Sequence, residues 1–131
     1  MKNFHDDNKE IKVLISPKQV LGYHWLVELY DCDSALLNDP KKVEHLLLDA
    51  ARRSKATVIE SCLHHFAPHG VSGVVVIAES HLTIHTWPEY GYAAFDIFSC
   101  GKEMLPQRAT DYVVEAFKAK RVVVQKVERG L

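Results

Sequence analysis

One stretch, Ile77–Tyr92, decides the fold of this chain; its sequence is IAESHLTIHTWPEYGY. Its central part, His81–Trp87, has the pattern of a strand, and the turn Pro88–Gly91 leads into another strand, Tyr92–Ser99. A connection this short favours antiparallel pairing, so the stretch predicts a hairpin within a sheet. The hairpin also carries a serine between a carboxylate and a histidine. Buried polar groups cost free energy unless they are paired, so this cluster requires an explanation.

The rest of the chain supplies further strands and two helices. Asp39 and Pro40 suit the N-cap and first position of a helix over about residues 40–54, and Pro106 can open a second helix. The order βα, a run of β, then αβ predicts the α+β class: a two-layer sandwich of a mainly antiparallel sheet with two helices on one face. Four more strands are expected, namely Leu21–Tyr30, Thr57–Phe66, Val71–Glu79 and Arg121–Val127.

The second face of this sheet is predicted to be covered as well. Val71–Glu79 and Tyr92–Ser99 lack the polar face that a strand bordering water normally has. With only two helices available, the expected cover is another subunit. We therefore expect the sheets to pack face to face in a homodimer, and the sequence leaves higher oligomers open.

Size and composition are those of one ordinary globular domain. The chain has 131 residues, 47% of them hydrophobic and 25% charged, with a net charge of −1. We expect a single domain over residues 19–131, preceded by a flexible N-terminal extension over residues 1–18. The near-neutral charge gives no reason to expect nucleic acid or a membrane surface as a partner. The short apolar runs and three cysteines without a CxxC pair favour a cytoplasmic location.

The turn also predicts the register of the hairpin. If it is centred after Glu89, Ser80 lies opposite Ser99 and close to Cys100. The histidines of the stretch flank this group, so a serine, a cysteine and histidines are expected to meet at one end of the hairpin. Ser80 and His85 are separated by an odd number of positions, so on a regular strand they point to opposite faces. The chain has to bend or break between them if both serve one site.

Taken alone, these residues leave several functions open. Ser80 with a histidine resembles part of a hydrolase triad, but the GxSxG turn of such enzymes is missing. A metal site could use His64, His65, His69, His81 and His85, but no metal-ligand spacing is present. Ordinary structural roles are also available: packing for Cys32, Cys62 and Cys100, a turn for Ser72, the core for Phe66 and an exposed turn for Glu89.

A longer pattern distinguishes between these alternatives. It consists of Glu79–Ala94, with the sequence ESHLTIHTWPEYGYAA, preceded by Gly70–Gly73 and followed by Phe98–Gly101. This pattern resembles that of the prokaryotic, pyruvoyl-dependent S-adenosylmethionine decarboxylase proenzymes. The likeness extends over residues 22–130, so it covers the whole predicted domain.

The resemblance implies that the chain cuts itself. The Ser80 hydroxyl would attack the carbonyl of Glu79, and loss of the Ser80 α-proton would eliminate the resulting ester. The products would be a β chain, residues 1–79, and an α chain, residues 80–131, which begins with a pyruvoyl group made from Ser80. By the same resemblance Ser72 and His85 assist the processing, with His85 as the base for the α-proton. A cut at this bond would also release Ser80 from strand alternation.

The resemblance also implies the reaction. The substrate amine forms a Schiff base with the pyruvoyl group, which acts as the electron sink when carbon dioxide leaves. Cys100 corresponds to the proton donor, Glu89 to the residue that holds the ribose hydroxyls, and Phe66 to the ring that stacks on the adenine. No metal is expected, and no pyridoxal phosphate, since the motif contains no lysine and Lys102 is the nearest one.

The predicted function is therefore decarboxylation of S-adenosylmethionine to the aminopropyl donor for spermidine and other polyamines. The alternative is the same self-processing chemistry acting on arginine or ornithine, because the processing residues serve any substrate with an amine and a carboxylate. A non-catalytic homologue is a third possibility. The joint presence of Ser72, Ser80, His85 and Cys100 argues against it.

Overall fold

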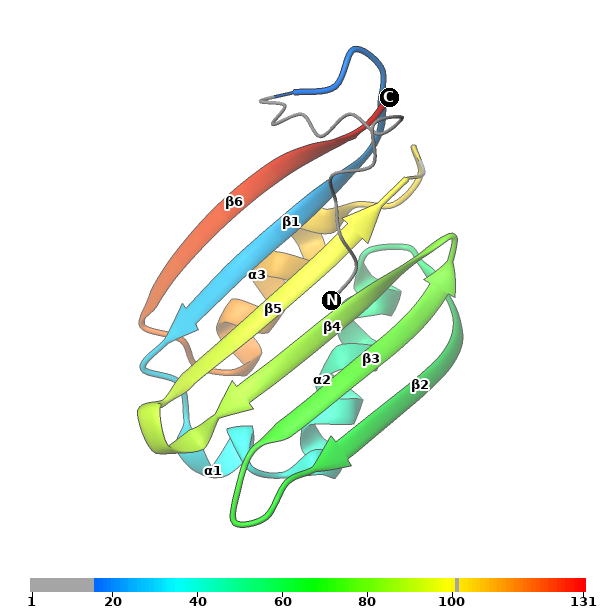
Figure 1. Ribbon diagram of the computed structural model, residues 1–131. Coiled ribbons are helices and arrows are strands. Elements are labelled where there is room, and N and C mark those ends of the chain that lie inside the picture. Colours follow the sequence, from blue (N-terminus) through cyan, green and yellow to red (C-terminus); the bar gives the residue numbers. More distant parts are fainter. Residues whose placement is uncertain (1–15, 101) are drawn as a thin grey trace, which may run out of the picture.

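A computed structural model describes residues 16–100 and 102–131 (Figure 1). The predicted extension, residues 1–18, lies mostly outside the described residues. The elements in chain order are β1 (Val20–Tyr30), α1 (Ser34–Leu37), α2 (Pro40–Arg53), β2 (Thr57–His65), β3 (Val71–Ala78), β4 (Ser80–Trp87), the 3₁₀ turn η1 (Pro88–Tyr90), β5 (Tyr92–Ser99), α3 (Pro106–Ala116) and β6 (Arg121–Gly130).

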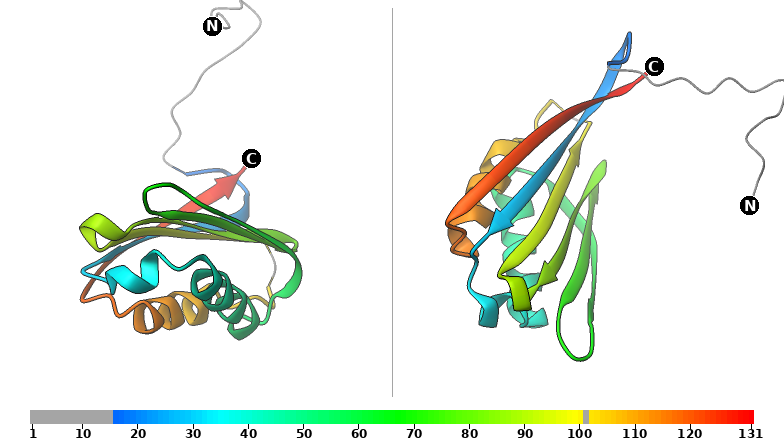
Figure 2. Two further views of the ribbon diagram at one scale, coloured as in Figure 1. Left: turned by 90° about the horizontal axis from the view of Figure 1, so that it is seen from below. Right: turned by 60° about the vertical axis from the view of Figure 1, so that its left-hand side comes forward.

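The six strands form one sheet in the order β2-β3-β4-β5-β1-β6, and all of its pairings are antiparallel. The helices lie together on one face of this sheet, as the view along the layers shows (Figure 2). The α+β sandwich expected from the sequence is therefore confirmed. No helix among the described residues is both long and apolar enough to cross a membrane.

Two short elements escaped the sequence prediction. Helix α1 has four residues, and η1 has three, so neither is long enough to show helical periodicity. Helix α1 begins where the Asp33 side chain accepts a hydrogen bond from the backbone N–H of Leu36. The predicted cap of α2 is confirmed, since Asp39 Oδ1 accepts a hydrogen bond of 3.1 Å from the N–H of Lys42.

The core lies between the sheet and the helices, because strand residues alternate between the two faces. On the central strands β4 and β5, Leu82, Ile84, Phe95 and Ile97 are buried against the helices. The intervening residues form the other face of the sheet, which no helix or strand of the described residues covers in Figure 2. It is less apolar than the sequence suggested, because Asp96 lies on it in β5. The premise that this strand lacks a polar side is therefore wrong, although the homodimer itself stays a prediction.

Candidate functional site

The turn between β3 and β4 brings three candidate residues together. Glu79 lies between the end of β3 and the start of β4, its peptide bond with Ala78 is cis, and Ser80 begins β4. The hairpin register is the predicted one, since His81 pairs with Phe98 and positions Ser80 beside the end of β5. Beyond that end, Cys100 Sγ donates a hydrogen bond of 3.3 Å to the carbonyl oxygen of Glu79. A serine hydroxyl, a thiol and the intervening peptide carbonyl thus lie at one end of the sheet.

The Ser80 hydroxyl is the unusual group in this turn. Its Oγ is buried and has no hydrogen-bond partner among the described residues. Buried hydroxyls are normally hydrogen-bonded, because an unpaired one costs about 1–3 kcal/mol. A hydroxyl without a hydrogen-bond partner need not break a hydrogen bond before it attacks a carbonyl, which fits a serine that reacts as a nucleophile.

A cavity of about 310 Å³ opens beside this turn. Its lining includes Glu79, Ser80 and Cys100 together with Lys55 and Lys102. The two lysines weaken one argument made from the sequence, in which the absence of a lysine from the motif counted against a lysine-bound cofactor. The expectation that no pyridoxal phosphate is used now depends on the family resemblance alone.

A second group of candidates lies further along the same two strands. Ser72 on β3 pairs with His85 on β4, and Ser72 Oγ is hydrogen-bonded to His85 Nδ1 at 2.7 Å. Both residues border a cavity of about 300 Å³ that Phe66 and Glu89 also line. No sequence pattern predicted that these four residues lie close together, and the structure places all of them around one cavity.

The two groups are well separated within the protomer. Ser80 and His85 are the first and sixth residues of β4, which corresponds to about 17 Å at about 3.3 Å per residue. They also fall on opposite faces of the strand, as the odd spacing predicted. The expected meeting at one end of the hairpin therefore holds for Ser80 and Cys100 but not for His85.

A polar network on the face away from the helices was missed from the sequence. His24 Nε2 is 2.6 Å from Asp96 Oδ2, and Thr83 Oγ1 donates a hydrogen bond to Asp96 Oδ1. His81 is also close: one potential metal-binding atom from each of His24, His81 and Asp96 lies within 4.8 Å of the other two. These residues come from three strands, so no local spacing could reveal them. Arg129 Nη1 lies 3.4 Å from His24 Nδ1, and since arginine can only donate, that nitrogen accepts and Nε2 carries the proton. This is the pattern of a hydrogen-bonded histidine–carboxylate pair rather than of metal ligands.

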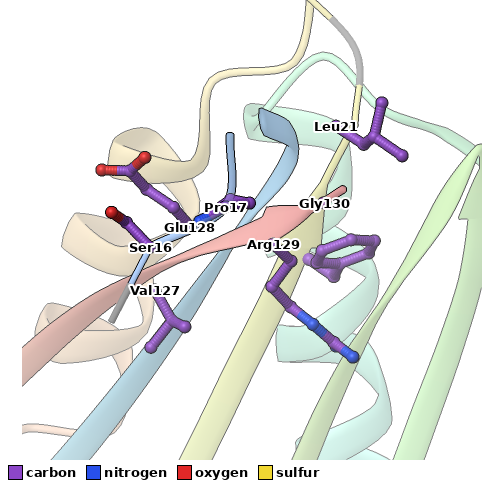
Figure 3. A pocket seen from close by; sticks show the side chains of 8 residues that line it. Ser16, Pro17, Leu21, Val127, Glu128, Arg129 and Gly130 are labelled. Atoms are coloured by element: carbon purple, nitrogen blue, oxygen red, sulfur yellow. The ribbon is translucent and has the colours of Figure 1, made fainter. Parts of the chain in front are cut away.

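Volume alone would point to another place. A cavity of about 520 Å³ lies where β1 and β6 meet, between Pro17, Leu21, Phe98, Val127 and Arg129 (Figure 3). None of the candidate catalytic residues lines it. Ligand sites are better recognised by convergent reactive groups than by size, so the two smaller cavities are the candidates.

The three cysteines do not all have the buried packing role that the sequence suggested for them. Cys32 is buried, and burial together with the nearby Asp31 carboxylate raises the pKa of its thiol to about 11. Cys62 and Cys100 are exposed, so packing was wrong for Cys62 in the protomer. Of the three thiols, Cys100 alone contacts the turn that contains Ser80.

Comparison with known proteins shows the family. A family model described as S-adenosylmethionine decarboxylase matches residues 23–130. The S-adenosylmethionine decarboxylase proenzyme of Thermodesulfovibrio yellowstonii is 50% identical over 111 residues, which are 85% of this chain and 82% of that protein. The proenzyme of Moorella thermoacetica is 52% identical over 113 residues, 86% of this chain and 90% of its own.

Solved structures show the same fold. The crystal structure of the adenosylmethionine decarboxylase from Aquifex aeolicus superposes with a TM-score of 0.80 at 38% identity, covering 86% of this chain and 93% of that one. The monomer of the Trypanosoma brucei enzyme has a TM-score of 0.58 at 17% identity, covering 78% of this chain and 44% of that one. The second likeness concerns the fold alone.

Proposed function

Because this chain belongs to the S-adenosylmethionine decarboxylase family, we propose that it is a proenzyme that cleaves itself between Glu79 and Ser80 and then decarboxylates S-adenosylmethionine. The product is the aminopropyl donor for spermidine and other polyamines. The observation that carries the proposal is the Ser80 hydroxyl. It is buried, has no hydrogen-bond partner in the described part of the chain, and lies beside a Glu79 carbonyl that accepts a hydrogen bond from Cys100. The alternative substrates, arginine and ornithine, have no support from the relatives.

Self-cleavage begins with the Ser80 hydroxyl. Its oxygen attacks the carbonyl carbon of Glu79, the amide nitrogen takes the proton, and the C–N bond gives way to an ester. Negative charge builds on the Glu79 oxygen in this step, and the Cys100 thiol is positioned to donate to it at 3.3 Å. A base then removes the Ser80 α-proton, Glu79 leaves as a carboxylate, and residue 80 becomes a dehydroalanine. Water then replaces its nitrogen, which leaves as ammonia, and residue 80 becomes the pyruvoyl group. The chain ends as residues 1–79 and residues 80–131.

The residues around Ser80 fit the group that this reaction makes. The new pyruvoyl group at residue 80 supplies an electron sink for decarboxylation, a role that other decarboxylases give to a bound cofactor. Cys100 reaches the same turn, and its S–H group is placed to return a proton to the substrate carbon. A mechanism without pyridoxal phosphate or metal remains a prediction.

The second group of residues acts across a subunit interface in this proposal. His85 is out of reach of Ser80 in its own chain, and Ser72 is bound to His85. In a face-to-face homodimer, a two-fold axis crossing the strands puts the Ser80 end of one sheet against the His85 end of the other. His85 of the partner subunit would then be the base for the α-proton, and the homodimer expected from the sequence becomes necessary for processing.

The same exchange completes the substrate site. Phe66 and Glu89 line the cavity at the His85 end, so they would serve the pyruvoyl group of the partner subunit. The Glu89 carboxylate can accept about two hydrogen bonds at each oxygen, which suits ribose hydroxyls, and the Phe66 ring is 48% exposed and free to stack on adenine. A cytoplasmic location and the lack of nucleic-acid or membrane partners stay predictions from the sequence.

Carbon dioxide release from three carboxyl-labelled substrates tests this function. We expect release from S-adenosylmethionine, and little from arginine or ornithine. Ser80→Ala protein should release none, because it cannot form the pyruvoyl group. Turnover of arginine or ornithine without turnover of S-adenosylmethionine would contradict the proposed substrate.

A further inference from the structure

His69 lies in the cavity that holds Glu89 but has no part in the mechanism above. It belongs to the β2–β3 turn, whereas Glu89 belongs to η1, and the two side chains meet through His69 Nε2 and Glu89 Oε2. The side chains are 37% and 35% exposed, so the pair is partly shielded from water. Partial burial lets such a contact fix geometry better than a fully exposed pair does.

The turn that carries His69 is anchored to the rest of the fold. The N–H of Gly70 donates to Asn38 Oδ1 at 2.9 Å, and Asn38 follows α1. The N–H of Val71 donates to Thr86 Oγ1 at 2.9 Å, and that hydroxyl is itself held by a backbone carbonyl. His69 is therefore presented from a fixed backbone, which is the condition for one side chain to orient another.

The composition of the cavity leaves His69 as the side chain that holds Glu89. No lysine or arginine is among the residues lining this cavity, and the other histidine there, His85, is hydrogen-bonded to Ser72. His69 engages only Oε2, so Oε1 has no partner among the described residues. A carboxylate held by one oxygen presents the other in a defined direction.

We propose that His69 is a positioning residue for substrate specificity: it orients Glu89 so that the carboxylate accepts hydrogen bonds from the ribose hydroxyls. Selectivity for a nucleoside substrate over a free amino acid then depends on His69 as well as on Glu89. This inference rests on the proposed function, because it concerns the nucleoside end of the same substrate site.

Binding of 5′-methylthioadenosine isolates this end of the site. The compound has the adenine and ribose but neither the amine nor the carboxylate, so calorimetry on cleaved enzyme reports nucleoside binding without turnover. We expect His69→Ala to raise its Kd and the KM for S-adenosylmethionine about tenfold, with kcat changed by less than about twofold, the scale of one charge-assisted hydrogen bond. His69→Gln keeps an N–H donor and should recover most of the affinity.

Two controls separate positioning from a general loss of structure. His45→Ala removes a histidine on α2 that is 71% exposed and does not line this cavity, so it should leave Kd unchanged. Self-cleavage of His69→Ala should proceed as in the wild type. An analogue without the 2′-hydroxyl should bind the wild type more weakly, but should lose little further affinity in His69→Ala, because the oriented carboxylate is already missing.

The outcomes distinguish the inference from the proposed function. Normal decarboxylation with an unchanged Kd in His69→Ala would overturn the role of His69 alone. A wild type that does not decarboxylate S-adenosylmethionine, but binds methylthioadenosine in a His69-dependent way, would overturn the proposed function and support the role of His69 in nucleoside binding. Equal losses in His69→Ala and His69→Gln, for both nucleosides, would also overturn the positioning role.

Discussion

The separation of Ser80 from His85 predicts that each subunit is processed by its partner. The two residues span about 17 Å along β4, whereas a base has to come within about 3 Å of the group that it deprotonates. Strand β4 is paired on both sides, with β3 and β5, so it cannot fold back to close this gap. We therefore predict that, in a homodimer, His85 of the partner subunit is the base that removes the Ser80 α-proton.

Co-expression of two inactive variants tests this prediction. Ser80→Ala keeps the base but cannot form the ester, and His85→Ala keeps the nucleophile but lacks the base, so each alone should stay uncleaved. In a mixed dimer, one site combines the intact Ser80 of one chain with the intact His85 of the other. If equal amounts of the two chains pair at random, about half of the His85→Ala chains enter mixed dimers and are cleaved. One of the two sites in each mixed dimer is then active, so activity should reach about a quarter of that of the same amount of wild-type protein.

Different affinity tags allow each chain to be followed by gel and by mass. Only the His85→Ala chain should be cut, and decarboxylase activity should appear in the doubly tagged fraction. Pairing His85→Ala with the double variant Ser80→Ala/His85→Ala is the matched control, because no intact base is then present. Mixed dimers in which neither chain is cleaved would refute processing between subunits, and so would cleavage of His85→Ala by itself.

Three further predictions follow from individual contacts. Cys100→Ala removes the hydrogen-bond donor at the Glu79 carbonyl, so self-cleavage followed by gel should be slower. It also removes the proton donor, so kcat of the cleaved fraction, measured by carbon dioxide release, should fall by about 10²-fold or more. An unchanged kcat would argue against the role of Cys100 as proton donor. The pKa of Cys32 is raised from 9.0 to about 11, so the stability that its protonated thiol contributes is complete below pH 9 and is lost between pH 9 and 11. Denaturant titrations should show a fall of about 2 kcal/mol in the free energy of unfolding over this range. This fall should vanish in Cys32→Ala and persist in Cys62→Ala. Asp39→Ala removes the α2 cap and should lower the free energy of unfolding by about 1 kcal/mol with activity retained, whereas an unchanged midpoint would mean that the cap is dispensable.

The central hairpin could be predicted because its turn is short and its pattern is local. A four-residue connection leaves one natural register, and β4 and β5 pair in it. The Asp39 cap of α2, the Pro106 start of α3 and the apolar spacing of both helices are likewise local signals. Helix α1 could not be found in this way, because four residues show no period.

The site was harder to predict because its contacts join distant strands. The His24–Asp96 pair links positions 72 residues apart, and no local pattern relates them. The contact between His69 and Glu89 could have been expected from the strand order. In consecutive antiparallel strands, the β2–β3 and β4–β5 connections lie at the same end of the sheet. The same reasoning would have separated His85 from Ser80, which lies at the opposite end.

Intact mass under denaturing conditions tests the central claim most directly. Active protein should contain two chains, residues 1–79 and residues 80–131, in equal amounts. Their summed mass should correspond to the full chain after exchange of one ammonia for one water, the change that converts Ser80 to a pyruvoyl group. A single species of full mass in active protein would contradict self-processing, and two fragments whose sum exceeds the chain by one whole water would indicate simple hydrolysis instead.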